Sequence, residues 1–194
     1  MPIARLMLVP MTLVAIAGAT ASAQDGASTQ PVAGRHGVWL SSGIGGGWNV
    51  LGNAGTGAGM GWSGYWRLGG TPSRRLRLGA EFSYWLRRHD ELVTERGNLA
   101  CVGQYYPSDA TGLFVKGALG LSIASDDFEI LPGFVGAETS FGVGTTFGAG
   151  IDIPVVWILS VTPNVDWLGA LGFSGESGSW SVFHLALGIT LQPR

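Results

Sequence analysis

Charged residues are scarce in this chain, and the scarcity excludes several classes of protein. Only 12% of the 194 residues are charged, whereas a typical soluble protein carries about 25%. Intrinsic disorder needs low hydrophobicity and high net charge, but 46% of this chain is hydrophobic and its formal net charge is −2. Lys116 is the only lysine, so the basic surface that nucleic-acid binding requires is missing. An ordinary soluble enzyme and a nucleic-acid partner are therefore both disfavoured.

Cysteine is almost absent as well, and potential metal ligands are not grouped. Cys101 is the single cysteine, so no disulfide within the chain can support the fold. His36 and His184 are isolated, and no spacing of His, Cys, Asp and Glu has the pattern of a structural metal site. The glycine run at 43–47 lacks the lysine and helix that follow a phosphate-binding loop. We therefore expect no metal and no cofactor.

The first 23 residues have the three regions of a secretory signal peptide. Arg5 supplies the positive region, residues 6–17 are apolar, and Ala21-Ser22-Ala23 forms a cleavage sequence of small residues. An apolar stretch of about 12 residues is too short for a membrane-spanning helix, which needs about 20. We expect cleavage after residue 23, a periplasmic lead-in at 24–35 and one barrel domain at 36–192.

Glycine, by contrast, is abundant, with 33 residues in the chain. The stretch from His36 to Trp66 has no Asp, Glu, Lys or Arg and is rich in glycine. Each glycine in a helix interior costs about 1 kcal/mol relative to alanine, so this stretch is not a helix. Its apolar residues recur instead at every second position, which is the period of a strand with two unlike faces.

The same alternation recurs along the chain and predicts an all-β fold. Leu78 and Phe82, for example, alternate with Arg77 and Glu81. Eight segments are candidate strands of this kind, the fourth of them ambiguous in phase: 38–48, 57–68, 75–87, 98–106, 113–123, 143–153, 159–167 and 183–192. Each is near the length of a tilted strand that crosses a bilayer, and an even number of strands closes as an antiparallel barrel. We predict an eight-stranded antiparallel up-and-down transmembrane β-barrel.

The second face of these segments decides between a membrane barrel and a soluble lipocalin-like carrier. A soluble barrel would present many Lys, Glu and Asp residues to water, but here that face is mostly Gly, Ser, Thr and Ala. Small residues suit the narrow interior of an eight-stranded barrel, which side chains fill. We expect Leu78, Phe82 and Leu187 to face lipid, and Gly61 and Gly148 to face the interior.

The links between the segments alternate in length. The longer links are expected at 49–56, 88–97, 125–140 and 168–179, and the shorter ones at 69–74, 107–112 and 154–157. Long outer loops with short periplasmic turns are typical of bacterial outer-membrane barrels. Aromatic residues beside the links predict two interfacial girdles. They are Trp66, Tyr106 and Trp157 by the short turns, and Trp48, Tyr84 and Trp167 by the long loops.

Four stretches resemble the small outer-membrane barrels of the OmpA and OmpX types. They are GVWLSSGIGGGW at 37–48, Tyr-Tyr-Pro at 105–107, LFVKGALGLS at 113–122 and FHLALGITL at 183–191. The resemblance covers about residues 36–192. It implies a location in the outer membrane of a Gram-negative cell and insertion by the barrel-assembly machinery, which recognises the last strand. The chain departs from the pattern by ending in Leu191-Gln192-Pro193-Arg194 instead of an aromatic residue. We expect a monomer.

Charged residues on the small-residue face are expected to meet inside the barrel. They are Arg67, Arg75, Arg77, Glu81, Lys116, Asp152 and Asp166. Charges in a low-dielectric interior need partners, so this set predicts a plug of ion pairs that closes the lumen. Lys116 and Asp152 fall near the periplasmic ends of neighbouring strands and could form one of these pairs. The alternative is a small pore.

Three arginines in or beside the second long link are candidate contacts for outer-membrane lipid and lipopolysaccharide. They are Arg87, Arg88 and Arg96, and arginine recognises phosphate groups in a bidentate manner. The third long link is acidic and could bind divalent cations weakly, although solvated acidic loops are commoner. Its acidic residues are Asp126, Asp127, Glu129 and Glu138.

Catalysis is the rival reading of the second long link. His89 lies beside Asp90 and Glu91, and a lipid A-modifying hydrolase or acyltransferase would need such a base. A nucleophile must lie within hydrogen-bond reach of it, but no motif connects Ser83 to His89. We therefore expect no enzyme, and a structural or surface-interaction role for the exposed loops.

Overall fold

The structure is a computed structural model that describes residues 35–51, 59–89, 92–108, 111–131, 134–172 and 179–193. The expected signal peptide and nearly all of the lead-in lie outside these residues. The strands are β1 (Val38–Leu51), β2 (Gly59–Ser73), β3 (Leu76–His89), β4 (Leu92–Tyr105), β5 (Leu113–Leu131), β6 (Phe134–Ile151), β7 (Ile153–Val156), β8 (Leu159–Gly172) and β9 (Trp180–Leu191). No helix in the described part of the chain is long and apolar enough to cross a membrane.

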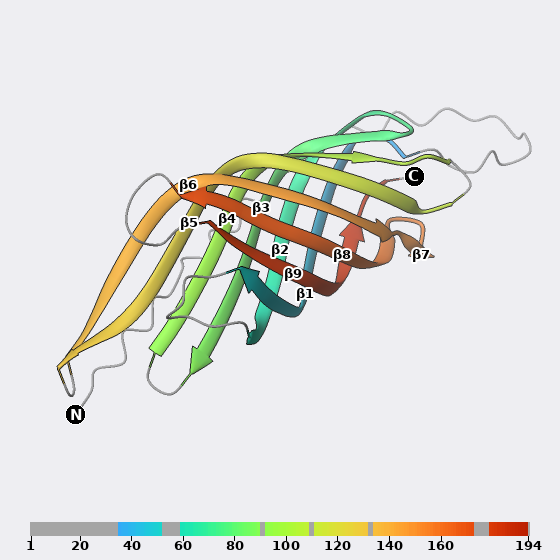
Figure 1. Cartoon of the computed structure of the whole chain (residues 1–194). Helices are drawn as coiled ribbons and strands as arrows, with labels where there is room; N and C mark the ends of the chain where they lie inside the picture. The colour runs from blue at the N-terminus through green and yellow to red at the C-terminus, as the bar shows by residue number, and fades with distance from the viewer. Residues whose placement is uncertain are drawn as a thin grey trace, which may run out of the picture. The chain divides into compact units, whose positions relative to one another are not determined.

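The strands form one closed antiparallel sheet (Figure 1). Neighbours follow the order β6-β5-β4-β3-β2-β1-β9-β8, and β6 pairs with β8 to close the barrel. The short strand β7 continues β6, because Gly150 pairs with Asn164 and Ile153 with Val161 in one register on either side of Asp152. The wall therefore has eight strands, and the predicted eight-stranded antiparallel barrel is confirmed.

The two faces of the wall carry the residue types that the alternation predicted. Leu78, Phe82 and Leu187 are 48%, 43% and 61% exposed on the outside. Gly61 and Gly148 face the interior, where a Cβ would overlap the Trp85 ring and the Asp166 carboxylate, so both expectations are confirmed. In hydrocarbon, a closed sheet pairs the backbone groups that an open edge would leave unsatisfied. The apolar outside and the closed ladder are together those of a transmembrane barrel.

The strands run further at the loop end than the sequence predicted. β4 begins at Leu92 instead of near residue 98, β5 continues to Leu131 and β6 begins at Phe134. Segments 88–97 and 125–140, expected to be long loops, are therefore mostly strand, and β5 with β6 forms the long hairpin of Figure 1. The polar residues in these segments mark where a strand leaves the apolar part of the wall, and the backbone ladder continues beyond that point.

The aromatic residues expected at the interfaces lie on the outside, with one exception. The exposed ones are Trp48, Trp66, Trp157 and Trp167. Tyr84 is half-buried on the same face. Tyr106 is fully buried, so its assignment to a girdle was wrong. It follows the last residue of β4 and turns into the end of the barrel, where its hydroxyl donates to Asp152.

Candidate functional site

Four charged side chains meet inside the barrel and form what we call the central charge cluster: Arg67, Glu81, Lys116 and Asp166. The Arg67 Nε donates to Glu81 Oε2, and its Nη2 donates to Asp166 Oδ2 at 3.0 Å. The Lys116 Nζ donates to Glu81 Oε2 and lies 3.0 Å from Asp166 Oδ2. Each of these side chains is at most 1% exposed. The two cations and two anions neutralise one another, which offsets the cost of removing them from water.

The register of the sheet explains how these residues reach one another. Arg67 and Glu81 are directly opposed on β2 and β3. On the other side of the barrel, Lys116 on β5 is opposed to Gly148 on β6, and Gly148 is opposed to Asp166 on β8. Because Gly148 has no side chain, the Lys116 ammonium passes over it to the carboxylate two strands away. A Cβ at Gly148 would overlap Asp166 Oδ1.

Aromatic rings border the central charge cluster. The guanidinium carbon of Arg67 lies 3.6 Å from the centroid of the Tyr65 ring, a distance at which a cation is attracted to the ring face. A Cβ at Gly43 or Gly188 would overlap the Tyr65 ring, so the glycines of β1 and β9 make room for it. The His184 Nδ1 lies 3.8 Å from Asp166 Oδ2. The cluster is thus enclosed by rings as well as by its own ion pairs.

A second polar group, which we call the basal cluster, lies at the short-turn end of the barrel: Arg77, Gln104, Tyr106, Asp152 and Gln192. The Arg77 Nη1 and the Tyr106 hydroxyl each donate to Asp152 Oδ2 at 2.8 Å. The Arg77 Nε donates to Gln192 Oε1 at 3.0 Å. The basal cluster therefore ties β3 to the residues that follow β4, β6 and β9.

Two expectations about the interior charges were wrong. Lys116 and Asp152 do not pair, since Lys116 contacts Glu81 and Asp166 while Asp152 contacts Arg77. Arg75 is exposed in the tight turn between β2 and β3, where the ladder has ended and alternation no longer fixes the face.

The closure of the barrel explains why Lys116 and Asp152 lie apart. The strands are staggered, so that a row of paired residues leaving β6 at Ser140 returns to β6 at Gly150. Residues at similar distances from their strand ends therefore differ in height along the barrel. The sequence showed which face Lys116 and Asp152 occupy but not this height.

An apolar group fills the interior toward the loop end, and of its members the sequence predicted Trp85 as a large interior residue but not Leu168. This outer apolar layer consists of Trp85, Ala124, Leu168, Ala170, Trp180 and Val182. The Trp85 Nε1 donates to the backbone oxygen of Gly47 at 2.9 Å, so its polar atom is satisfied. Leu168 has the same strand parity as Asp166, so alternation along β8 could have predicted that Leu168 faces the interior.

The three arginines expected to contact lipopolysaccharide have different surroundings. The two terminal nitrogens of Arg96 donate to the two carboxylate oxygens of Asp126 at 2.8 and 2.9 Å, so Arg96 already has a bidentate partner inside the wall. The Arg87 guanidinium lies where a Cβ at Gly59 would be. Arg88 is exposed on the outer face and makes no ion pair with any residue that the structure describes.

Among the described residues, no contact supports a catalytic site or a cation-binding site in the long links. Ser83 is buried in the barrel, but the side chain of His89 lies outside the described part of the structure, as do Asp90 and Glu91. The side chains of Asp127, Glu129 and Glu138 also lie outside it. Within the described ranges, no group of three or more His, Cys, Asp or Glu residues could hold a metal ion.

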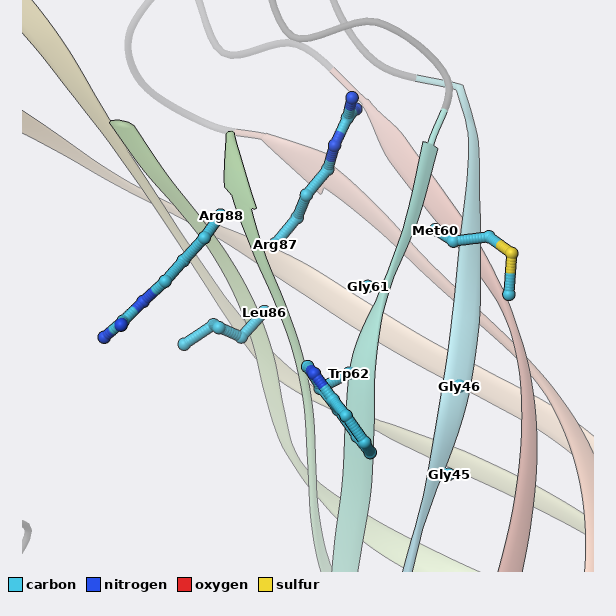
Figure 2. Close-up of a pocket in the computed structure, with 8 residues that line it drawn as sticks. All are labelled: Gly45, Gly46, Met60, Gly61, Trp62, Leu86, Arg87 and Arg88. Atoms are coloured by element: carbon cyan, nitrogen blue, oxygen red, sulfur yellow. The ribbon is translucent and has the colours of Figure 1, made fainter. Parts of the chain in front are cut away.

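A hollow of about 580 Å³ lies at the loop end of β1, β2 and β3 (Figure 2). Gly46, Met60, Trp62, Leu86 and Arg88 are among the residues that line it. Met60 and Trp62 are each 69% exposed. Figure 2 shows Arg87 and Arg88 pointing in different directions from the end of β3. The hollow is therefore an apolar surface with two arginines, Arg87 and Arg88, among its lining residues.

Comparison with known proteins identifies the fold. No family model and no curated protein matches the sequence, but solved structures match the barrel. Neisserial surface protein A has a TM-score of 0.59 at 13% identity, with 82% of this chain and 99% of that one covered. Ail, the attachment invasion locus protein of Yersinia pestis, has a TM-score of 0.57 at 10% identity, with 81% and 99% covered. The chain has the fold of the eight-stranded outer-membrane barrels, as its resemblance to them implied.

Proposed function

We propose that this protein is a monomeric outer-membrane barrel with a structural or surface-interaction role, and that its own side chains close its lumen. The central charge cluster carries the proposal, because its four charges are buried and paired with one another. A water-filled channel would keep such charges hydrated. An eight-stranded barrel is just wide enough for side chains to fill, and the basal cluster and the outer apolar layer occupy the lumen on either side.

Planar-bilayer recording tests the closed lumen against the small-pore alternative. The purified mature chain is added to a bilayer, and the current is recorded at several voltages. We expect no stepwise conductance, because ions would have to separate the paired charges of the central cluster to pass. Stable stepwise openings of the native protein would contradict the proposal.

The proposed location rests on the apolar outer face and on the expected signal peptide. Large apolar side chains are exposed on β1 through β9, and water would disfavour such a surface. Insertion by the barrel-assembly machinery is part of this proposal. Cell fractionation with heat-modifiable gel mobility tests it: we expect recovery in the outer membrane, with unheated protein migrating differently from heated protein. Recovery in the soluble periplasm without detergent would favour the lipocalin-like carrier.

Lipopolysaccharide is the partner that we propose for the loop end. Arg88 supports this choice, since it is an exposed cation on the lipid-facing side of the wall. We propose contact without catalysis. Mass spectra of lipid A from cells with and without the gene should be identical. A difference in acyl chains that His89→Ala abolishes would show instead that the protein is a lipid A-modifying enzyme.

A further inference from the structure

The ladder between β2 and β3 stops earlier at the loop end than the ladders beside it. Among the described residues, the pairing of β2 with β3 ends at Trp62 and Leu86. The pairing of β1 with β2 continues to Gly59, and the pairing of β3 with β4 continues to His89. The wall therefore separates between residues 59–61 of β2 and residues 87–89 of β3. Backbone groups that lose ladder partners in a lipid environment need another polar partner.

The hollow of Figure 2 lies beside this separation. Gly46 contributes to its floor, and the nearest atom to a Cβ built there is the Gly61 oxygen at 3.9 Å. The hollow is thus open above Gly46, while Trp62 and Leu86 form apolar sides. Its volume of about 580 Å³ falls within the range of ligand sites, roughly 300–1,000 Å³. An apolar chain lying along the wall fits this shape and chemistry.

The edge of the hollow carries a positive charge. Arg88 follows Leu86 on the same outward face of β3 and lines the same hollow. Its guanidinium offers a planar set of donors that suits a phosphate group. A single ligand that places an acyl chain over Gly46 and a phosphate at Arg88 would match both features. Such a ligand is an anionic lipid.

We propose that this hollow is a seat for one lipopolysaccharide molecule, with an acyl chain of lipid A over Gly46 and a lipid A phosphate at Arg88. The inference rests on the proposed function, which places the loop end in the outer leaflet. Lipopolysaccharide is the phosphate-bearing lipid of that leaflet, so the position of Arg88 at the loop end favours it over a phospholipid of the inner leaflet.

Retention of lipid A during purification tests the seat. The full mature chain is reconstituted in nanodiscs of phosphatidylcholine with lipid A, extracted in mild detergent, and analysed by native mass spectrometry. We expect one retained lipid A per barrel. Gly46→Leu fills the hollow and should reduce retention about tenfold, on the order expected when several buried methylene groups lose their contacts. Gly70→Leu is the matched control, because Gly70 also has open space around its Cβ position and lies at the other end of the wall.

A second pair of variants tests the phosphate contact. Arg88→Ala should lower retention by roughly threefold to tenfold, as expected for a partly exposed charged contact. Arg74→Ala, at an exposed arginine in the β2–β3 turn, should leave retention unchanged. Lipid A without its phosphates should bind Arg88→Ala and the native chain equally. Heat-modifiable mobility confirms that each variant is folded before its retention is compared.

The outcomes separate the seat from the broader proposal. Loss in Arg88→Ala with no loss in Gly46→Leu would keep the lipopolysaccharide contact and overturn the acyl-chain seat. No loss in either variant would overturn both. Equal retention of phosphatidylglycerol and lipid A would overturn the assignment to lipopolysaccharide. Loss in Gly46→Leu and Arg88→Ala, with the two controls unchanged, supports the seat as described.

Discussion

Lys116 and Asp166 form an ion pair across an intervening strand, because the residue between them in the sheet is Gly148. The Lys116 Nζ lies 3.0 Å from Asp166 Oδ2. This contact requires both the charges and the absence of a side chain at Gly148. Glycine therefore has a specific structural purpose here, which its abundance in the sequence does not reveal.

Gly148→Ala should destabilise the barrel by disturbing this ion pair. The new Cβ would overlap Asp166 Oδ1 and approach the Val165 backbone oxygen to 2.6 Å. We expect the free energy of unfolding to fall by about 1–3 kcal/mol, measured by urea titration of the refolded barrel with tryptophan fluorescence.

Gly117→Ala is the matched control for this substitution. Gly117 is opposed to Phe147 in the same pair of strands, but a Cβ there would lie 3.8 Å from the Phe147 ring, at an ordinary contact distance. Its effect should stay within about 0.5 kcal/mol. Equal losses for the two variants would show that Gly148 does not serve the ion pair.

Glu81→Gln should be strongly destabilising, because the Glu81 carboxylate accepts hydrogen bonds from both cations of the central charge cluster. The substitution leaves Arg67 and Lys116 with one carboxylate between them. Breaking a buried ion pair in this way costs about 3–5 kcal/mol, which urea unfolding would detect.

Adding Lys116→Met to Glu81→Gln should recover part of that loss. The remaining Arg67 and Asp166 then balance each other, and their hydrogen bond at 3.0 Å is retained. We expect the double variant to be more stable than Glu81→Gln alone in the same titration. If the double variant is less stable than Glu81→Gln, charge balance is not the reason that the central charge cluster stabilises the barrel.

Trp85→Ala should destabilise the barrel more than Trp62→Ala does. Trp85 is 1% exposed within the outer apolar layer, whereas Trp62 is 69% exposed on the outside. Removing a buried tryptophan leaves a cavity and costs about 3–5 kcal/mol, while lipid fills the space left by an outer one. Comparison of unfolding midpoints for the two variants checks this order. The reverse order would show that contacts with lipid stabilise the barrel more than the outer apolar layer does.

The turn after β7 should lie in the lipid headgroup region at the short-turn end. All four residues of β7 are exposed, and Trp157 next to them is 72% exposed. Tryptophan favours the interface between membrane and water. A nitroxide at Val156→Cys, in a Cys101→Ser background, should be accessible to oxygen and protected from a water-soluble nickel reagent in lipid vesicles.

A nitroxide at Ser73→Cys, in the same Cys101→Ser background, provides the comparison for the β7 turn. Ser73 is exposed at the end of β2, beside the polar turn at Arg74, and this label should be accessible to the nickel reagent. If the label at position 156 were equally accessible to nickel, the turn would extend into water.

Alternation predicted the faces of the wall well, because a side chain's direction in a strand depends only on its parity. Leu78, Phe82 and Gly148 are therefore where the sequence placed them. The strand ends were less predictable. Charged residues such as Glu95 and Asp126 look like loop residues, yet the ladder between β4 and β5 includes both.

The partners of the interior charges could not be read from the sequence. The sequence identified Arg77, Asp152 and Lys116 as interior residues, but the stagger of the closed barrel decides which of them meet. The burial of Tyr106 does follow from parity, because the buried Val102 and Gln104 on β4 have the same parity. Parity alone could have identified Leu168 as interior, since it lies two residues from Asp166 on the same strand.

The origin of Asp166 on β8 has a consequence for how the barrel is assembled. Arg67 and Lys116 come from β2 and β5, and Glu81 on β3 is their only carboxylate partner within the central cluster until β8 arrives. A nascent sheet of β1 through β6 would thus hold an unbalanced positive charge facing its concave side. Adding β8 beside β6 supplies Asp166 and balances the two cations, so the four charges neutralise one another only after β8 has joined the sheet.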